Sequence, residues 1–224
     1  MSVPIITIDG PSGSGKGTIS HLLSKRLGWH LLDSGAIYRL CALACIDKGI
    51  DLDDENQAYQ VSRSLEIKFD VSDSGVNILL GNKDVTSRIR DEVVGMAAST
   101  IAAYSSVRSE LLTCQKAFAK MPGLVADGRD MGTVVFKEAK LKFFLTASAE
   151  TRADRRVKQL AEKGIKADYQ EVLDAIKQRD FQDESRTNAP LKPAKDAILV
   201  DSSDKTIDEV LHVMLDQARV SFLL

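Results

Sequence analysis

A glycine-rich stretch near the N-terminus constrains the fold of this chain more than any other feature. The residues GPSGSGKGT, Gly10 to Thr18, lie between a short apolar, β-branched run at 3–9 and a segment with helical periodicity at 16–27. Glycines in a strand-to-helix turn allow backbone N–H groups to point inward around an anion, and the helix N-terminus adds its partial positive charge. Lys16 adds a full charge that can reach the β- and γ-phosphates of a nucleotide. We therefore expect a phosphate-binding loop.

This loop departs from the usual pattern at one position. Gly17 follows the lysine, and the hydroxyl that can serve Mg²⁺ is postponed to Thr18. The K-G-T ending resembles the nucleoside monophosphate kinases more than the GTPases or motor ATPases. A glycine-rich turn with a surface lysine and no ligand is the alternative, but the strand and helix that the motif requires are both present.

Composition limits the partners of the chain. Its 224 residues suffice for one well-buried core, so we expect a single domain, 1–224, with mobile subregions. Thirty basic and thirty-two acidic residues give a net charge of −2, which predicts no nucleic-acid partner and no anionic membrane partner. No stretch approaches the roughly 18 apolar residues of a membrane helix, and the phosphate loop begins too early for a cleaved signal peptide. We expect a cytoplasmic monomer.

The cysteines and histidines do not indicate a metal centre. An odd, sparse count of cysteines is not a disulfide framework. Cys41 and Cys45 share a face of an expected helix, and core packing is favoured because no further Cys or nearby His completes a tetrahedral set. The histidines are scattered along the chain, at positions 21, 30 and 212.

Strand and helix patterns alternate along the chain. We expect strands at 3–9, 30–33, 123–127, 140–146 and 196–200, and helices at 16–27, 35–48, 87–103, 106–119, 150–163, 168–184 and 205–219. This alternation predicts an α/β fold with a parallel sheet covered on both faces. Ligands bind at the carboxyl ends of such strands, so the loops after Asp9, Asp33, Asp127 and Thr146 should meet around one crevice.

The alternation is interrupted between the second and third core strands. LEIKFDV, SDSG and VNILLGNKDVT show period-two patterns around turn residues, which predicts a small antiparallel insert at about 63–86. An insert at this place suits a region that closes over an acceptor substrate. A decorative hairpin is the alternative.

Charged residues follow the expected strands and recur on two helices. Ser34 and Arg39 begin a helix, and VADGRDMG packs Asp127, Arg129 and Asp130 into four positions. Two later sets each share a helix face: Arg152, Arg155 and Arg156, and then Arg179, Asp183 and Arg186. Mixed charges on a helix usually form a solvated face. Beside a phosphate loop, however, forked arginines are suited to clamp a transferring phosphoryl group.

The motifs together resemble a known family. GPSGSGKGT, LLDSGAIYR, RDEVVGMAAS with VR at 107–108, LVADGRDMGTVVF and IKQRDFQDESR extend from end to end of the chain. They resemble the bacterial cytidylate kinases, which make CDP from CMP and ATP. The resemblance implies a P-loop nucleoside monophosphate kinase fold, with a five-stranded parallel sheet flanked by helices. It further implies a nucleotide-binding insert at about 34–104 that contains extra antiparallel strands, and a mobile lid at about 152–166.

The resemblance also implies ligands and residue roles. ATP is the donor, CMP and dCMP are the acceptors in pyrimidine metabolism, and Mg²⁺ is the cofactor. In the family, ATP is held by residues matching Gly10, Pro11, Ser12, Gly13, Ser14, Gly15, Lys16, Gly17 and Thr18. Residues matching Arg39, Arg129 and Arg186 bind the acceptor phosphate, those matching Ser34, Arg108 and Asp130 read cytosine, and those matching Ser99, Arg179 and Asp183 face the pentose. We expect catalytic roles for Lys16, Arg129, Arg155 and Arg186, and Mg²⁺ near Thr18 and, through water, Asp127.

The expected base reading has independent chemical support. Cytosine offers an exocyclic amine as donor with N3 and O2 as acceptors, so a carboxylate and an arginine complement it, whereas uracil reverses the polarity at two of these atoms. A kinase of the same fold acting on shikimate or UMP is the nearest alternative. A P-loop switch or nucleic-acid-stimulated ATPase would show an NKxD segment, a strand ending in Asp-Glu or a basic face, and the sequence has none of these.

Overall fold

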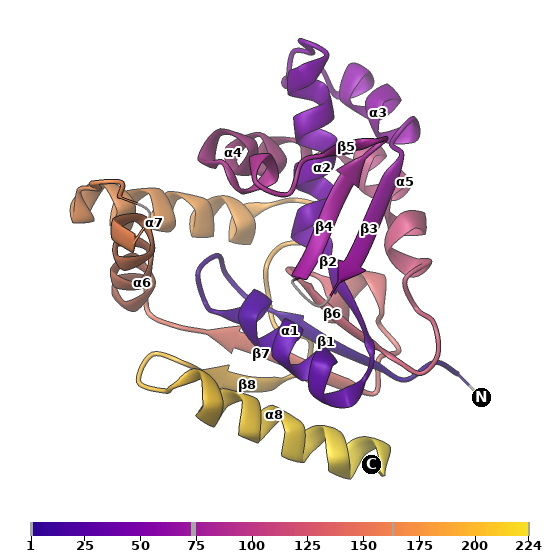
Figure 1. Ribbon diagram of the computed structural model, residues 1–224, viewed down its shortest axis with the longest axis vertical. Helices are drawn as coiled ribbons and strands as arrows, with labels where there is room; N and C mark the ends of the chain where they lie inside the picture. Colours follow the sequence, from indigo (N-terminus) through magenta and orange to yellow (C-terminus); the bar gives the residue numbers. More distant parts are fainter. Residues whose placement is uncertain (1, 73–74, 163, 224) are drawn as a thin grey trace. The chain divides into compact units, whose positions relative to one another are not determined.

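The computed structural model describes residues 2–72, 75–162 and 164–223. They fold into two compact units, the first comprising Met1–Leu32 with Lys116–Leu224 and the second Asp33–Gln115 (Figure 1). The insert expected at about 34–104 falls within the second unit. The division of the chain into kinase core, insert and lid stays a prediction.

A five-stranded parallel sheet forms the centre of the first unit. Its order is β2-β6-β1-β7-β8, with bounds Ile5–Asp9 (β1), His30–Asp33 (β2), Leu124–Gly128 (β6), Leu141–Thr146 (β7) and Ile198–Asp201 (β8). Ile8 of β1 is in register with Asp127 of β6 and Phe143 of β7. Because the pairing is parallel, the carboxyl ends of β6, β1 and β7 meet at one edge. The predicted α/β fold is confirmed.

Among the described residues of this unit, four helices and one short turn accompany the sheet. Their bounds are Lys16–Leu27 (α1), Met131–Val135 (η2, a π-helical turn), Ala149–Glu162 (α6), Tyr169–Ser185 (α7) and Ile207–Phe222 (α8). Helices α1 and α8 pack beside each other against the sheet (Figure 1). Fully buried Leu23 of α1 and Met214 of α8 belong to one apolar core cluster together with Ile8 and Phe143 of the sheet. Helices α6 and α7 pack against each other.

The second unit combines helices with a small antiparallel sheet. Its elements are α2 (Ser34–Asp47), α3 (Glu55–Arg63), β3 (Ile67–Ser72), β4 (Gly75–Leu80), β5 (Lys83–Asp84), η1 (Arg88–Arg90, a 3₁₀ helix), α4 (Glu92–Ile101) and α5 (Ser105–Lys116). The order β3-β4-β5 confirms the antiparallel insert expected at about 63–86. Cys41 and Cys45 are fully buried in α2, which confirms their predicted place in the core.

One helix differs from the expectation. The segment 87–103 was predicted as a single helix, but it contains η1 and α4 separated by Asp91. Asp91 adopts φ −65° and ψ 144°, an extended conformation that cannot continue the hydrogen-bonding pattern of η1. The second helix therefore begins afresh at Glu92.

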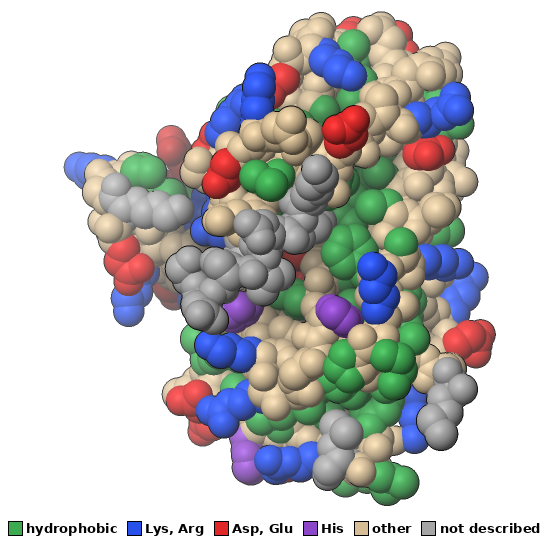
Figure 2. Space-filling model, turned by 45° about the vertical axis from the view of Figure 1, so that its right-hand side comes forward, with side chains coloured by type: hydrophobic (Ala, Val, Ile, Leu, Met, Phe, Trp, Pro, Cys, Tyr) green, Lys and Arg blue, Asp and Glu red, His purple; other side chains and the backbone are tan. Residues whose placement is uncertain are grey.

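The described surface mixes charges of both signs. On the face drawn in Figure 2, Lys and Arg side chains are interspersed with Asp and Glu. Within the described residues, the structure contains no helix that is both long and apolar enough to cross a membrane.

Candidate active site

The glycine-rich segment forms the connection between β1 and α1. Gly13 and Gly15 have φ values of 77° and 90°, which glycine adopts at little cost. A Cβ at Gly10 would lie 2.0 Å from the carbonyl oxygen of Leu145, so only glycine allows the loop to leave β1 this close to β7. A Cβ at Gly15, which caps α1, would meet no atom within 4 Å. The start of α1 is thus open to an anion.

Two polar side chains of the loop fit a polyphosphate ligand. Lys16 is 9% exposed, and its Nζ donates a hydrogen bond to the carbonyl oxygen of Pro11 at 3.0 Å, across the loop. Ser14 is buried, and its Oγ has no hydrogen-bond partner in the structure. Because a buried polar atom without a partner is costly, this hydroxyl is suited to a ligand that supplies one.

Two side chains with oxygen atoms lie on or beside the start of α1. Asp127, the residue before the last of β6, lies so close to α1 that a Cβ at Gly17 would be 3.4 Å from its Oδ2. The next residue, Thr18, is exposed. The described residues contain no group of three or more His, Cys, Asp and Glu side chains that could hold a metal alone. Mg²⁺ commonly binds through one or two carboxylates together with substrate phosphates, so Thr18 and Asp127 fit this ion.

A buried cluster of two arginines and one carboxylate lies between β6 and α7. Asp183 of α7 is 2% exposed, and it accepts hydrogen bonds from Arg129 Nε at 2.8 Å and from Arg186. Burial tends to raise the pKa of Asp183, but Arg129 and Arg186 outweigh burial and lower it below the ordinary value. Burial tends to lower the pKa of Arg129, and Asp183 with Asp127 more than offsets this. The cluster is therefore fully charged at neutral pH and is not the solvated helix face considered above.

Two further predicted site residues of the first unit, Asp130 and Arg179, are close in sequence to the residues of this cluster. Asp130 is 3% exposed and stands immediately before η2. Arg179 is half-buried on α7, one turn before Asp183. The structure thus places the predicted acceptor residues of this unit directly after β6 or along α7 and its end.

Asp9 was named from the sequence only as the residue that precedes the phosphate loop, and its contacts with η2 were not predicted. Its buried carboxylate accepts hydrogen bonds from the amides of Met131 and Gly132, each at 2.8 Å, and so fixes the start of η2 against the end of β1. A Cβ at Gly132 would lie 2.9 Å from Thr7 Oγ1, so glycine is needed for this approach. Burial raises the pKa of Asp9 to about 6, although the two amide hydrogen bonds act in the opposite direction.

The raised pKa of Asp9 predicts a pH dependence of stability. Between about pH 4 and 6 the native protein retains a proton that the unfolded chain has released, so the free energy of unfolding falls as pH rises. A shift from 3.8 to about 6 corresponds to about 3 kcal/mol, at 1.36 kcal/mol per pKa unit. Urea unfolding of wild type and Asp9→Asn from pH 4 to 7 should show the wild type losing about this amount relative to the variant. If the free energies of unfolding of the two proteins changed with pH in parallel, the raised pKa of Asp9 would be contradicted.

In the second unit, Ser34 and Arg108 are connected through α2 and α5. Ser34 is buried at the start of α2, and its Oγ accepts a hydrogen bond from Gln115 Nε2 at 3.1 Å. The guanidinium of Arg108 lies 5.7 Å from the ring centroid of Tyr38, and its Nη1 donates to Ala102 O at 3.1 Å. Tyr38 and Gln115 were not predicted as site residues.

The other two predicted residues of this unit have backbone partners. Arg39 Nη1 donates to the carbonyl oxygen of Ile89 at 3.2 Å, which joins α2 to η1. Ser99 Oγ donates to the carbonyl oxygen of Gly95 at 3.2 Å within α4. Both side chains are partly buried.

The three arginines of α6 have different surroundings. Arg152 is 4% exposed, whereas Arg156 donates to Gln159 on the helix surface. Arg155 Nη2 donates to the carbonyl oxygen of Ser202 at 2.6 Å. Ser202 Oγ in turn lies 3.2 Å from the carbonyl oxygen of Ser14. Arg155 is therefore connected to the phosphate loop through the residue that follows β8.

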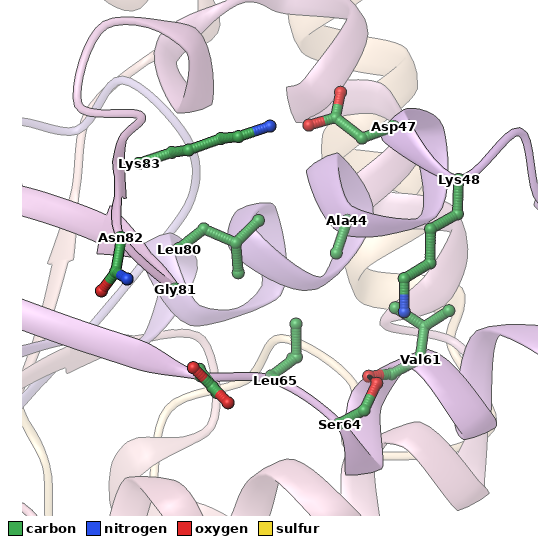
Figure 3. A pocket seen from close by; sticks show the side chains of 11 residues that line it. Ala44, Asp47, Lys48, Val61, Ser64, Leu65, Leu80, Gly81, Asn82 and Lys83 are labelled. Carbon is green, nitrogen blue, oxygen red and sulfur yellow. Dashed lines mark hydrogen bonds between the residues drawn. The ribbon is translucent and has the colours of Figure 1, made fainter.

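A pocket of about 370 Å³ lies in the second unit (Figure 3). It is bounded by the C-terminal ends of α2 and α3 and by the turn between β4 and β5. Ala44, Leu65 and Leu80 point into it, and the side chain of Lys83 extends toward Asp47 (Figure 3). Its lining includes no residue predicted to bind a nucleotide.

The parallel sheet, the glycine-rich loop entering α1 and Lys16 across that loop define a P-loop phosphotransferase. The family model described as cytidylate kinase matches residues 6–220, and the chain belongs to this family. It is 54% identical over 220 residues to the cytidylate kinase of Saccharophagus degradans, covering 98% of each chain. It is 53% identical over 215 residues to that of Aeromonas salmonicida, covering 96% of this chain and 94% of the relative.

The fold is also similar to a solved structure of low sequence identity. An uncharacterized protein from Eubacterium ventriosum matches with a TM-score of 0.52 at 10% identity, over 96% of this chain and 97% of that protein. This similarity supports the fold alone.

Proposed function

We propose that this protein transfers the γ-phosphate of ATP to CMP and dCMP, forming ADP with CDP or dCDP in pyrimidine nucleotide metabolism. The observation that carries the proposal is that a glycine-rich loop with a lysine and a cluster of two arginines lie at the same edge of one sheet. The loop with Lys16 follows β1, and the cluster of Arg129, Asp183 and Arg186 begins at the end of β6, the neighbouring strand. Membership of the cytidylate kinase family supports the choice of acceptor.

The donor side of the proposal uses the phosphate loop. Residues Gly10 to Thr18 hold the phosphates of ATP, and Lys16 places its charge on the β- and γ-phosphates. Thr18, together with Asp127 through water, holds Mg²⁺, which neutralises charge on the donor phosphates when it is bound. The open helix start, the buried Ser14 hydroxyl and the approach of Asp127 to Gly17 support these roles.

The acceptor side uses the arginines. Arg39, Arg129 and Arg186 bind the phosphate of CMP, one of whose oxygens attacks the γ-phosphorus. A new P–O bond forms while the bond from the γ-phosphorus to the bridging oxygen breaks, and ADP leaves with that electron pair. Arg129 is preorganised for the charge in the transition state, because Asp183 fixes its fork before substrate binds.

The proposed lid at 152–166 adds Arg155 to the transferring phosphoryl group. Its guanidinium is bonded to Ser202 in this structure, so this role requires it to exchange that contact during closure. Cytosine is read by Ser34, Arg108 and Asp130, and the pentose faces Ser99, Arg179 and Asp183. The protein acts in the cytoplasm, where ATP and CMP are found. It acts as a monomer, so one chain supplies every residue named above.

An acceptor panel tests this function. Wild-type protein with Mg·ATP is given CMP, dCMP, UMP or shikimate, and ADP release is followed. We expect CMP to give the highest kcat/KM, with turnover of dCMP and weaker turnover of UMP. A higher kcat/KM with UMP or shikimate would overturn the assignment.

Asp130→Asn is expected to lower the preference for CMP over UMP by about tenfold or more. An ionised carboxylate accepts from the amine of cytosine but faces the O4 acceptor of uracil, whereas the amide can turn its NH₂ toward O4. A base contact of this kind contributes roughly 1–3 kcal/mol of discrimination. The KM for ATP serves as the internal control and should stay at the wild-type value. If the ratio of kcat/KM values were unchanged while kcat alone fell, Asp130 would act on phosphate or metal instead.

A further inference from the structure

Arg152 is a buried arginine that joins three segments of the first unit. It lies on α6 with its side chain 5% exposed. Its Nε donates to the carbonyl oxygen of Ala147 at 3.0 Å, and Nη1 donates to the carbonyl oxygen of Ser12 in the phosphate loop at 3.0 Å. Nη1 and Nη2 also form a forked ion pair with Asp180 of α7, at 3.0 and 2.5 Å. One guanidinium therefore connects α6, the phosphate loop and α7.

The alkyl part of Arg152 faces the loop. A Cβ at Gly13 would lie 3.4 Å from Cβ and 3.6 Å from Cγ of Arg152, so the Arg152 side chain faces the position that a side chain at Gly13 would occupy. Arg152 is thus hydrogen-bonded to Ser12 and faces the next loop residue, Gly13. A loop that binds phosphate through its amides needs its backbone geometry to be set to within a fraction of an ångström.

Asp180, which pairs with Arg152, lies on α7 close to two predicted site residues. Asp180 lies beside Arg179 and one turn before Asp183. Helix α7 is therefore connected to the phosphate loop at Asp180 and to Arg129 at Asp183. These two contacts determine how α7 is rotated about its axis, and hence where its other polar side chains point.

We propose that Arg152 and Asp180 are positioning residues that set the phosphate loop and α7 in one fixed relation. Through this Arg152–Asp180 bridge, the loop that holds the donor phosphates and the helix that carries acceptor contacts keep their geometry before either substrate binds. The ligand identities rest on the proposed function. The bridge itself belongs to the protein without nucleotides.

The same two helices provide a matched control. Glu150 of α6 and Lys177 of α7 form an ion pair at 3.6 Å, with side chains 59% and 53% exposed. Exposed pairs contribute little because solvent screens them. Both ion pairs join α6 to α7, but only Arg152 also contacts the phosphate loop. If the connection between the two helices alone mattered, breaking the Glu150–Lys177 pair would have the same effects as breaking the Arg152–Asp180 bridge, with smaller size.

The first test compares Asp180→Asn with Lys177→Gln. Hydrogen–deuterium exchange is measured without nucleotide over residues 10–18, and kcat and KM are measured for ATP and CMP. We expect Asp180→Asn to speed exchange in the phosphate loop, although the changed residue lies on α7, and to lower kcat/KM by about 10- to 100-fold. Lys177→Gln should leave both quantities within twofold of wild type. Loop exchange in Asp180→Asn equal to wild type, or the same change in both variants, would overturn the proposal.

The second test separates positioning from stability. Arg152→Met combined with Asp180→Leu removes both buried charges and replaces them by apolar side chains of similar length, which folded proteins often tolerate. We expect this double variant to melt near the wild-type temperature, yet to retain the fast loop exchange and the low kcat/KM, because the Ser12 carbonyl has lost its donor. Full recovery of kcat/KM would show that the pair is only structural. A wild type that fails to phosphorylate CMP would contradict the proposed function, while the exchange measurements would still decide the bridge.

Discussion

Lys16→Ala is expected to lower kcat by about 10²- to 10³-fold or more while the protein remains folded. Phosphoryl transfer requires positive charge at the β- and γ-phosphates as the bond breaks, and a preorganised donor at such a position contributes a factor of this size. Lys16 lies across the loop, with its Nζ on the carbonyl oxygen of Pro11, so its charge is in place before ATP binds. The measurement is kcat at saturating ATP and CMP, with the thermal transition followed by circular dichroism.

A lysine at the other end of the same helix provides the control. Lys25 is exposed in the last turn of α1, and Lys25→Ala removes the same charge from the helix without touching the loop. We expect its kcat to equal that of wild type. Turnover close to normal in Lys16→Ala would reject the phosphate loop as the donor site.

Local sequence patterns were sufficient for most of the fold. The helix at 16–27 and the strand at 30–33 have in the structure the bounds that periodicity predicts, because a glycine loop and a closing glycine, Gly28, delimit the helix. Helix α3, Glu55–Arg63, was missed because its buried apolar side chains are only Ala58 and Val61. A signal was available, since Asp54 is followed three residues later by Gln57. The backbone N–H of Gln57 donates to Oδ1 of Asp54 at 3.0 Å, which caps the start of the helix.

The candidate site was predicted as far as its motifs extend. Arg129, Asp183 and Arg186 were all named from sequence, and the structure brings them together. The side chains that support the site were not predicted, because their partners are distant in sequence. Asp9 and Gly132 are 123 residues apart, and Gln115 and Ser34 are 81 apart. Such pairs are produced by the packing of strands and helices, which periodicity and spacing do not specify.

Asp183→Asn is expected to lower both the stability and the activity of the protein. Asp183 forms ion pairs with Arg129 and Arg186, whose side chains are 19% and 9% exposed. Removing one partner of a buried charge cluster leaves uncompensated charge, at a cost of about 3–5 kcal/mol in the free energy of unfolding. Because the carboxylate also fixes the fork of Arg129, kcat/KM for CMP should fall by about 100-fold. Asp216→Asn is the control, since Asp216 is 48% exposed and pairs with Arg219 on the surface of α8.

The pH dependence shows whether the lost stability comes from charge. The pKa of Asp183 is lowered in the folded protein, so its contribution is present above the ordinary Asp range and is lost as pH falls through the folded-state pKa. The difference in unfolding free energy between wild type and Asp183→Asn should therefore be largest near pH 7 and shrink toward acid pH. If the difference in unfolding free energy did not change with pH, the lost stability would come from packing and not from charge. Full stability with reduced kcat/KM would instead show that Asp183 acts on the substrate alone, and that Arg129 and Arg186 are neutralised by other groups.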